Sequence, residues 1–351
     1  MDTNLPMDAP IDGPMALAAQ PACALRVDEK DATLTVRDDA GRVLSRWTLH
    51  AQDGAMLLQW CDGGPTGADG WAALRAACAR WPRAARFTLA GAPQAWVRTL
   101  LDRGVATFEG GMPQVLRAGL LQQPEPWLAQ PRPPYAQRHT VSEGRRHPVR
   151  APRQDGECYA RDIPWLGSRL SITAFSLDTD LAALNRWMND PVVAHFWQEE
   201  GSLDKHRAYI EGLLADPRVA PLVLRLDGRA FGYVEAYWAK EDRIAPFYDA
   251  QDYDRGWHVL IGEADCRGRD FVTAWQPSVA HYLFLDDPRT QRLVIEPRAD
   301  NHKMRRNLLL GGYAILKEFD FPHKRAALGM LLRERFFDET AWLSAPAASA
   351  P

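Results

Sequence analysis

The order of strand-like and helix-like segments in the second half of the chain constrains the fold more than any other feature. Between about residues 165 and 337, runs in which apolar residues alternate predict strands, and longer runs with a helical period predict helices. Their order is a strand, two helices, three strands, a helix, a strand, a helix and two strands. Asp227-Gly228, between two of these strands, is typical of a hairpin turn. This order predicts an α+β domain.

The first half of the chain is interpreted as a smaller α+β domain. Three alternating runs over residues 23–49 predict an antiparallel meander, and helix and strand patterns continue to residue 121. Residues 122–157 are rich in Pro and Arg and lack apolar periodicity, which favours a linker over a phosphate-contacting segment. We expect domains at 23–121 and 158–340, joined by the linker 122–157 and flanked by flexible tails at 1–22 and 341–351.

Composition excludes several classes of protein. The 351 residues are 46% hydrophobic and 25% charged, as in ordinary globular proteins. A formal net charge of -3 gives no basic surface of the kind that nucleic acid requires. The sequence has neither a run of ~20 apolar residues nor the basic start of a signal peptide. The five cysteines are scattered without a CxxC pair. We therefore expect a cytoplasmic protein that uses no metal, nucleic acid or membrane.

Three motifs carry a family resemblance. The segments DRGWHVLIG, HYLFLDDPRTQRLVIEPRADN and FPHKRAALGMLLRERFF are similar to the siderophore-biosynthesis branch of the GCN5-related N-acetyltransferase (GNAT) superfamily, typified by the aerobactin N6-hydroxylysine acetyltransferases. The resemblance implies a GNAT fold, with a mixed, mostly antiparallel sheet flanked by helices. It also implies acetyl-CoA or another acyl-CoA as co-substrate and a small-molecule N-hydroxy amine as acceptor. Other siderophore-pathway enzymes are expected partners of a monomer or homodimer.

The two halves of the chain contain segments with the same order of predicted elements. Residues 86–111 and 292–319 both follow the pattern strand, helix, glycine, strand. We hypothesise that the first domain is a degenerate half of the GNAT fold. Because such alternation recurs by chance in many α/β proteins, unrelated strand orders in the two halves would reject this hypothesis.

The turn at residues 266–272 is the candidate binding site for the pyrophosphate of CoA. It follows a strand and opens a helix, where backbone N–H groups and the helix dipole favour anions. Arg267, Gly268 and Arg269 fit this role, whereas Asp270 and Val272 stand where the family has small residues. The alternative is an arginine-rich surface turn.

His258 is the centre of the candidate active site. A histidine in a strand is usually a hydrogen-bonded core residue, but the resemblance implies a place at the acceptor site, where a neutral imidazole accepts a proton from the attacking amine or bonds its hydroxyl. Asp300 corresponds by resemblance to the acidic partner of His258, and a helix N-cap is the alternative. Glu296 is the less favoured acidic candidate. We expect His258 and Asp300 to be catalytic.

The other candidates belong to the cofactor and the acceptor. A backbone N–H on the strand with Leu260 and Ile261 is expected to hold the oxyanion formed from the thioester. Glu235 is a candidate partner for a cationic amino acid or diamine, and residues 240–255 are long enough to form a lid over the acceptor. Aromatic residues here are as typical of a core as of a ligand wall. The predicted cofactor-binding residues are Leu260, Ile261, Arg267, Gly268, Arg269, Asn301 and Arg305, and the predicted substrate-binding residues are Trp197, Glu235, Tyr237 and Trp238.

Several functions stay open at this level. Acetylation of an N-hydroxylated lysine-like amine to a hydroxamate is the leading hypothesis. A second is transfer of succinyl or another acyl group to N-hydroxyputrescine or N-hydroxycadaverine. A third is a catalytically silent module that binds acyl-CoA, because the phosphate turn is altered. An aminoglycoside acetyltransferase is the weakest, since its polycationic substrate calls for more carboxylates.

Overall fold

The computed structural model describes residues 16–17, 25–52, 55–64, 67–82 and 84–338. The chain forms two compact units. Unit 1 comprises Met1–Ala129, Ala160–Arg169 and Phe337–Pro351, and unit 2 comprises Gln130–Tyr159 and Leu170–Phe336. The predicted tails fall outside the described residues, apart from residues 16–17. Most of the predicted linker, from residue 130 onward, is thus part of unit 2.

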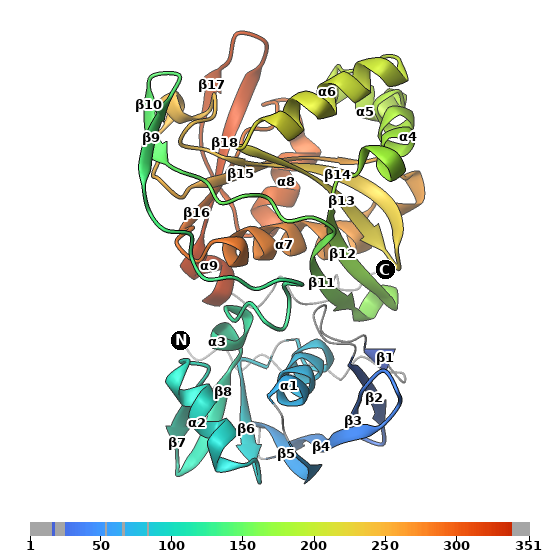
Figure 1. Cartoon of the computed structure of the whole chain (residues 1–351), viewed down its shortest axis with the longest axis vertical. Helices are drawn as coiled ribbons and strands as arrows, with labels where there is room; N and C mark the ends of the chain where they lie inside the picture. The colour runs from blue at the N-terminus through green and yellow to red at the C-terminus, as the bar shows by residue number, and fades with distance from the viewer. Residues whose placement is uncertain (1–15, 18–24, 53–54, 65–66, 83, 339–351) are drawn as a thin grey trace. The chain divides into compact units, whose positions relative to one another are not determined.

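The described part of unit 1 is built on an eight-stranded sheet with the order β1-β2-β3-β4-β5-β6-β8-β7 (Figure 1). β1 to β5 form an antiparallel meander, and β6 pairs with β5 in parallel after the helix α1. The strands are β1 (Ala16–Leu17), β2 (Arg26–Lys30), β3 (Thr33–Arg37), β4 (Val43–Gln52), β5 (Ala55–Gly63), β6 (Arg86–Ala90), β7 (Ala106–Glu109) and β8 (Met112–Leu116). The helices are α1 (Ala68–Arg80), α2 (Gln94–Asp102) and α3 (Arg117–Leu121).

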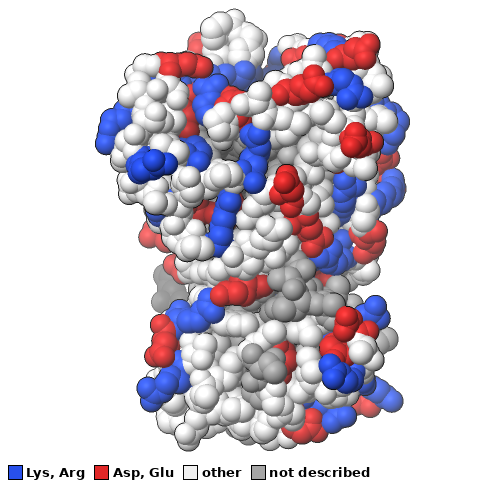
Figure 2. All heavy atoms as spheres, viewed as in Figure 1, with Lys and Arg blue, Asp and Glu red and all other residues white. Residues whose placement is uncertain are grey.

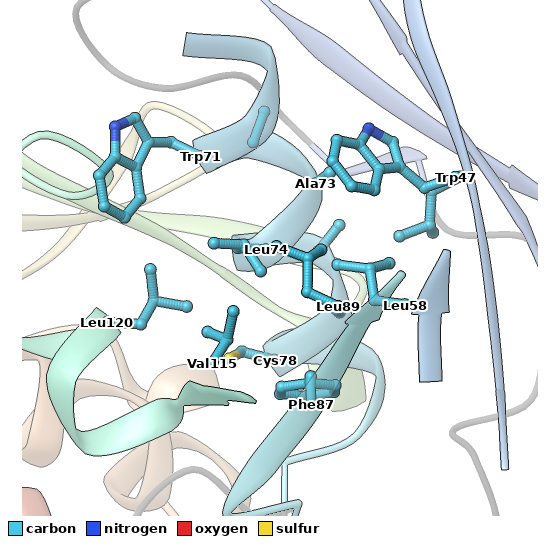
Figure 3. Packing of buried hydrophobic residues seen from close by; sticks show 14 of the residues in the cluster. Trp47, Leu58, Trp71, Ala73, Leu74, Cys78, Phe87, Leu89, Val115 and Leu120 are labelled. Carbon is cyan, nitrogen blue, oxygen red and sulfur yellow. The ribbon is translucent and has the colours of Figure 1, made fainter. Parts of the chain in front are cut away.

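The core of unit 1 lies between α1 and the sheet. Leu74 and Cys78 of α1 lie beside Leu58, Phe87 and Leu89 of the strands, as Figure 3 shows. All these side chains are buried. Burial of each large apolar side chain contributes about 1.5–3 kcal/mol, so this cluster stabilises the unit.

The sheet of unit 2, as far as the structure describes it, has eight strands in the order β11-β12-β13-β14-β15-β16-β18-β17. Its first two strands, β11 and β12, include residues of the segment 160–169, which is assigned to unit 1. The chain therefore passes from one unit to the other within these two strands. The strands are β11 (Glu157–Ile163), β12 (Ser168–Ala174), β13 (Val219–Leu226), β14 (Arg229–Trp238), β15 (Arg255–Ile261), β16 (Arg292–Ile295), β17 (Ala314–Asp320) and β18 (Arg325–Leu332). A separate hairpin, β9 (His139–Ser142) and β10 (Arg145–Pro148), lies within the predicted linker.

Helices connect the strands of unit 2. Three of them lie between β12 and β13, where the sequence predicts two; the additional one is α5, whose first turn is capped by Asp190 ahead of Pro191. The last predicted strand is also shorter than expected, because residues from Arg333 onward form α9. The helices are α4 (Leu177–Met188), α5 (Pro191–Trp197), α6 (Leu203–Ala215), α7 (Arg269–Asp286), α8 (His302–Leu310) and α9 (Arg333–Asp338).

Sequence signals explain the hairpin between β13 and β14. Asp227 and Gly228 both have positive φ, 47° and 83°. This is the backbone of a two-residue type I′ turn, which favours the predicted Asp-Gly pair. The turn aligns β14 with β13, and β14 in turn pairs with β15 along the whole of β15.

β15 and β16 separate soon after they meet. They pair in parallel at only two positions, Arg255 with Leu293 and Gly256 with Val294. Beyond these positions the backbone groups along one edge of β15 have no strand partner among the described residues. This opening lies directly beside His258.

The two sheets have the same strand order. In each, five strands form a meander, a helix leads to a parallel sixth strand, and a further helix leads to a hairpin whose second strand pairs with the sixth. The hypothesis is that the first domain is a degenerate half of the GNAT fold; the shared order is consistent with a relation between the two sheets, but the described sheet of unit 1 has all eight strands rather than half of them. Between β2 and β3, however, unit 1 has a tight turn where unit 2 has α4 to α6.

Neither a membrane-spanning helix nor a metal-binding cluster is present among the described residues. Within them, no helix combines the length and hydropathy needed to cross a bilayer. The same residues contain no group of three or more His, Cys, Asp or Glu side chains arranged to hold a metal ion. On the face drawn in Figure 2, acidic and basic side chains are interspersed over both units.

Candidate active site

His258 lies on β15 beyond the last residue that pairs with β16. Its neighbour across the sheet is Glu235 of β14, so both side chains lie on the same face. Glu296 directly follows β16. The divergence of β15 from β16 leaves room for the imidazole of His258 between the two glutamates.

Both ring nitrogens of His258 face carboxylate oxygens. Nδ1 lies 3.2 Å from Oε2 of Glu235, and Nε2 lies 2.6 Å from Oε1 of Glu296. The imidazole keeps 24% of its side-chain surface exposed, whereas Glu296 is fully buried. Because an ionised carboxylate only accepts hydrogen bonds, both nitrogens must carry a proton to make these bonds. The geometry therefore fits an imidazolium.

Tyrosine hydroxyls satisfy the remaining oxygens of the two glutamates. Tyr209 and Tyr233 both donate to Oε1 of Glu235, the latter at 3.1 Å. Tyr237 donates to Oε2 of Glu296 at 2.6 Å. Each carboxylate oxygen thus has a donor, and each glutamate is fixed in orientation.

The same contacts shift the pKa of both charged partners. Burial alone would lower the pKa of His258, but the charge of Glu296 and hydrogen bonds from both glutamates outweigh it and raise that pKa to about 10. Burial would raise the pKa of Glu296, yet the charge and hydrogen bond of His258 hold it well below its usual range. At neutral pH His258 is therefore cationic, which corrects the expectation of a neutral imidazole.

In the structure the carboxylate partner of His258 is Glu296, and not Asp300 as predicted. Asp300 is paired with Arg298 at 2.7 Å, and 63% of its side-chain surface is exposed. It is not the N-cap of α8 either, because the side chain of Asn301 accepts from the N–H of Met304. The sequence analysis ranked Glu296 below Asp300, because the pattern of β16 does not reveal which of the residues that follow it faces the opening beside β15.

The predicted acceptor residues fall into two groups. Trp197 and Tyr237 lie near His258, with ring centroids 6.5 and 4.9 Å from the imidazole. Glu235 is also at the site, but it holds His258 and two tyrosines, so the predicted role as partner of a substrate cation does not fit. Trp238 faces the opposite side of β14, where its ring lies between the guanidinium groups of two arginines, Arg150 and Arg255.

The phosphate turn has helical geometry without the expected arginine. Gly268 precedes α7 with a φ of 141°, which favours glycine, and the first amides of α7 are directed away from the helix. Arg267 donates instead to the carbonyl oxygens of Ile261 and Gly262 and pairs with Asp190 at 3.4 Å. The expected phosphate contact of Arg267 is thus replaced by a contact that holds the end of β15, and the exposed Arg269 is the cation left at the turn.

Two side chains donate hydrogen bonds to backbone carbonyl groups on the open edge of β15. Nε1 of Trp197 donates to the carbonyl of Val259 at 3.3 Å, and Arg267 donates to that of Ile261. Since successive backbone groups of a strand point to opposite edges, the N–H groups of Val259 and Ile261 face the opening. Leu260, paired with Tyr233, directs its own toward β14. Of the two residues predicted to supply the oxyanion donor, only Ile261 fits.

Two further predicted cofactor residues lie at the start of α8. Asn301 caps the helix, as described above. Arg305 donates to the carbonyl of Ala299 and pairs with Glu318 at 2.9 Å. Its guanidinium is therefore committed to the protein, which argues against a direct phosphate contact.

The predicted lid, residues 240–255, is held by the hairpin of β9 and β10 and by the residues that follow it. The guanidinium of Arg150 makes two hydrogen bonds to the buried carboxylate of Glu241, at 2.6 and 2.5 Å. His139 contacts Asp252 at 2.8 Å. These contacts hold the segment in place within unit 2.

Comparison with known proteins identifies the family of this fold. Residues 176–321 match the family model described as acetyltransferase (GNAT) domain. This part of the chain belongs to the GNAT acetyltransferase family. An uncharacterised protein from Bacillus halodurans has a similar structure, with a TM-score of 0.51 and 25% identity, covering 54% of this chain and 96% of that one.

Several curated relatives are similar in sequence over the same region. The N(6)-hydroxylysine O-acetyltransferase of Escherichia coli is 45% identical over 192 residues, 55% of this chain and 61% of the relative. A hydroxyornithine transacylase of Ajellomyces capsulatus is 40% identical, over 55% of this chain and 45% of the relative. A putative lysine N-acyltransferase of Schizosaccharomyces pombe is 38% identical, over 63% and 66%. The matches thus leave a third or more of each relative uncovered.

Proposed function

We propose that the protein is an acyl-CoA-dependent N-acyltransferase that acylates an N-hydroxylated amine of lysine or a similar amine and so forms a hydroxamate for siderophore biosynthesis. The observation that carries the proposal is His258, fixed between Glu235 and Glu296 where β15 leaves β16. The similarity to a hydroxylysine acetyltransferase and a hydroxyornithine transacylase supports this class of acceptor. A cytoplasmic location and siderophore-pathway partners remain predictions.

Acetyl-CoA or another acyl-CoA fits the open edge and the turn beside it. The amides at the start of α7 and the side chain of Arg269 suit a pyrophosphate. The N–H groups of Val259 and Ile261 suit the carbonyl groups of the pantetheine arm and the thioester. Bound there, the thioester lies beside the face of β15 that carries His258.

The chemistry is direct transfer. The nitrogen of the N-hydroxy amine attacks the thioester carbonyl, and a backbone N–H on the open edge stabilises the oxyanion. The C–S bond then breaks, the nitrogen loses its proton and the CoA thiolate gains one. The hydroxyl oxygen withdraws electrons from the nitrogen, which therefore attacks unprotonated at neutral pH.

The cationic state of His258 changes its role in proton transfer. Since the imidazolium has no free lone pair, it does not accept the proton from the nitrogen. Glu296 is fully buried and both of its oxygens are occupied, so this proton passes to the departing CoA thiolate, which balances the transfer. The two glutamates hold the imidazolium in place beside the reacting nitrogen.

One observation favours the alternative, a catalytically silent module that binds acyl-CoA. Arg267 donates to backbone carbonyl groups of the protein and is not directed to the phosphate site. Calorimetric titration with acetyl-CoA, followed by thiol-release assays with N6-hydroxylysine, N-hydroxycadaverine and N-hydroxyputrescine, separates the two. We expect binding and thiol release that depends on an N-hydroxy acceptor. Binding without release on any acceptor, with acetyl-CoA or succinyl-CoA, would favour the silent module.

A further inference from the structure

The carboxylates nearest His258 are not free to hold a cationic substrate. The oxygens of Glu235 accept from Tyr209, Tyr233 and His258. Those of Glu296 are similarly occupied, and its side chain is fully buried. A diamine therefore finds no unused glutamate at this point, and the recognition of the acceptor must use other groups.

Arg243 is the charged group that the site leaves exposed. Its guanidinium lies 3.7 Å from Oε1 of Glu296 and keeps 51% of its side-chain surface exposed. The same oxygen bonds Nε2 of His258 at 2.6 Å. Because both contacts end on one atom, Arg243 lies within a few ångströms of the imidazole, at the length scale of a small amino acid.

Two more basic side chains gather beside Arg243. Phe321 lies under the guanidinium at 5.4 Å and under Nζ of Lys324 at 5.6 Å, and the ring of His323 stacks on Phe321. Nζ of Lys324 also donates to the backbone carbonyl of Glu296 at 2.7 Å. Arg243 and Lys324 thus bring positive charge to one side of the site.

The backbone on either side of Arg243 is fixed. Arg145 of β10 donates to the carbonyl oxygens of Glu241, at 3.0 Å, and Asp242. The N–H of Ile244 donates to the side chain of Asp242 at 3.0 Å. A binding group on a fixed backbone loses little entropy when its ligand arrives.

We propose that Arg243 binds the α-carboxylate of the acceptor, so that the protein selects an N-hydroxy amino acid over the corresponding N-hydroxy diamine. This rests on the proposed function. A guanidinium forms paired hydrogen bonds with a carboxylate, and an exposed one close to the reacting nitrogen can do so without dismantling the glutamates. Lys324 adds positive potential from the other side of Phe321.

N6-hydroxylysine and N-hydroxycadaverine test the proposal because they differ only in the α-carboxylate. KM and kcat are measured for both with the full chain, with R243Q and R243K, and with R207Q as the control on an exposed arginine of α6. We expect wild type to prefer N6-hydroxylysine, and R243Q to raise its KM roughly 10- to 100-fold, the usual effect of losing a charge-assisted bond. KM for N-hydroxycadaverine should change far less, R243K should restore part of the preference, and R207Q should match wild type.

Equal changes for the two acceptors in R243Q would overturn the proposal, since Arg243 would then act through Glu296 and His258. A wild type that uses both acceptors equally well would also overturn it while leaving the proposed function intact. Failure of wild type to acylate any N-hydroxy acceptor would reject the proposed function, and the carboxylate site with it.

Discussion

The two sheets share a strand order but differ at the one place where unit 2 carries its candidate site. In unit 1, β5 and β6 pair at four consecutive positions, from Met56 with Phe87 to Gln59 with Ala90. In unit 2, the corresponding strands β15 and β16 pair at two positions and then separate. A sheet of this topology therefore does not by itself create the opening; the opening needs residues that keep the strands apart.

Shared hydrogen bonds align the two units residue by residue. The N–H of Arg117 donates to the carbonyl of Ala85 in unit 1, and that of Arg333 donates to the carbonyl of Gln291 in unit 2. This register places Gln59 at the position of His258, Ala90 at that of Glu296 and Thr48 at that of Glu235.

The difference shows what the chemistry needs beyond the fold. At these equivalent positions unit 1 has uncharged side chains and unbroken strand pairing. It also has a two-residue turn, Asp31-Ala32, where unit 2 places the helices that supply Tyr209 and Trp197. Charged residues and covering helices, rather than strand order, distinguish the candidate site.

The largest expected effect comes from replacing His258 with glutamine, the residue that unit 1 has at the equivalent position, Gln59. H258Q should lower kcat by about 10² to 10⁴, because it removes the cation that the two glutamates position beside the reacting nitrogen. Thiol release from acetyl-CoA with N6-hydroxylysine measures this. The matched control is Q59H, which we expect to leave the rate unchanged because the position in unit 1 has no carboxylate neighbours. Wild-type turnover in H258Q would remove His258 from the mechanism.

A smaller effect separates the two acidic candidates. D300N should keep kcat within about threefold of wild type, because Asp300 is an exposed partner of Arg298 and surface ion pairs contribute little. E296Q, tested beside it, should lower kcat strongly, because it removes the charge that balances His258. The opposite order of the two variants would restore Asp300 as the acidic partner.

Local signals in the sequence predicted much of the fold. The Asp227-Gly228 turn and the alternation of β13 to β15 depend on nearby residues, and the structure has them where expected. The sequence did not predict the hairpin of β9 and β10 within the linker, because its charged residues have partners far along the chain, such as Asp252 for His139. Long-range ion pairs leave no periodic pattern.

Only part of the candidate site could be predicted, because its remaining contacts join residues that are far apart in the sequence. His258, which one of the family motifs contains, lies near Trp197 and Tyr237. The partner of His258 depends on which strand residue faces the opening, and its protonation depends on two carboxylates brought together by the sheet. Neither can be derived from spacing along one strand.

The pKa of His258, followed by NMR of its imidazole in wild type and E296Q, tests the central claim most directly. The account predicts no titration of wild type between pH 6 and 8 and a midpoint near 10, because the carboxylates hold the proton on the folded protein. E296Q should move the midpoint to lower pH. A wild-type midpoint near the ordinary histidine value of about 6.5 would contradict the account, since His258 would then be the neutral base that the two glutamates exclude.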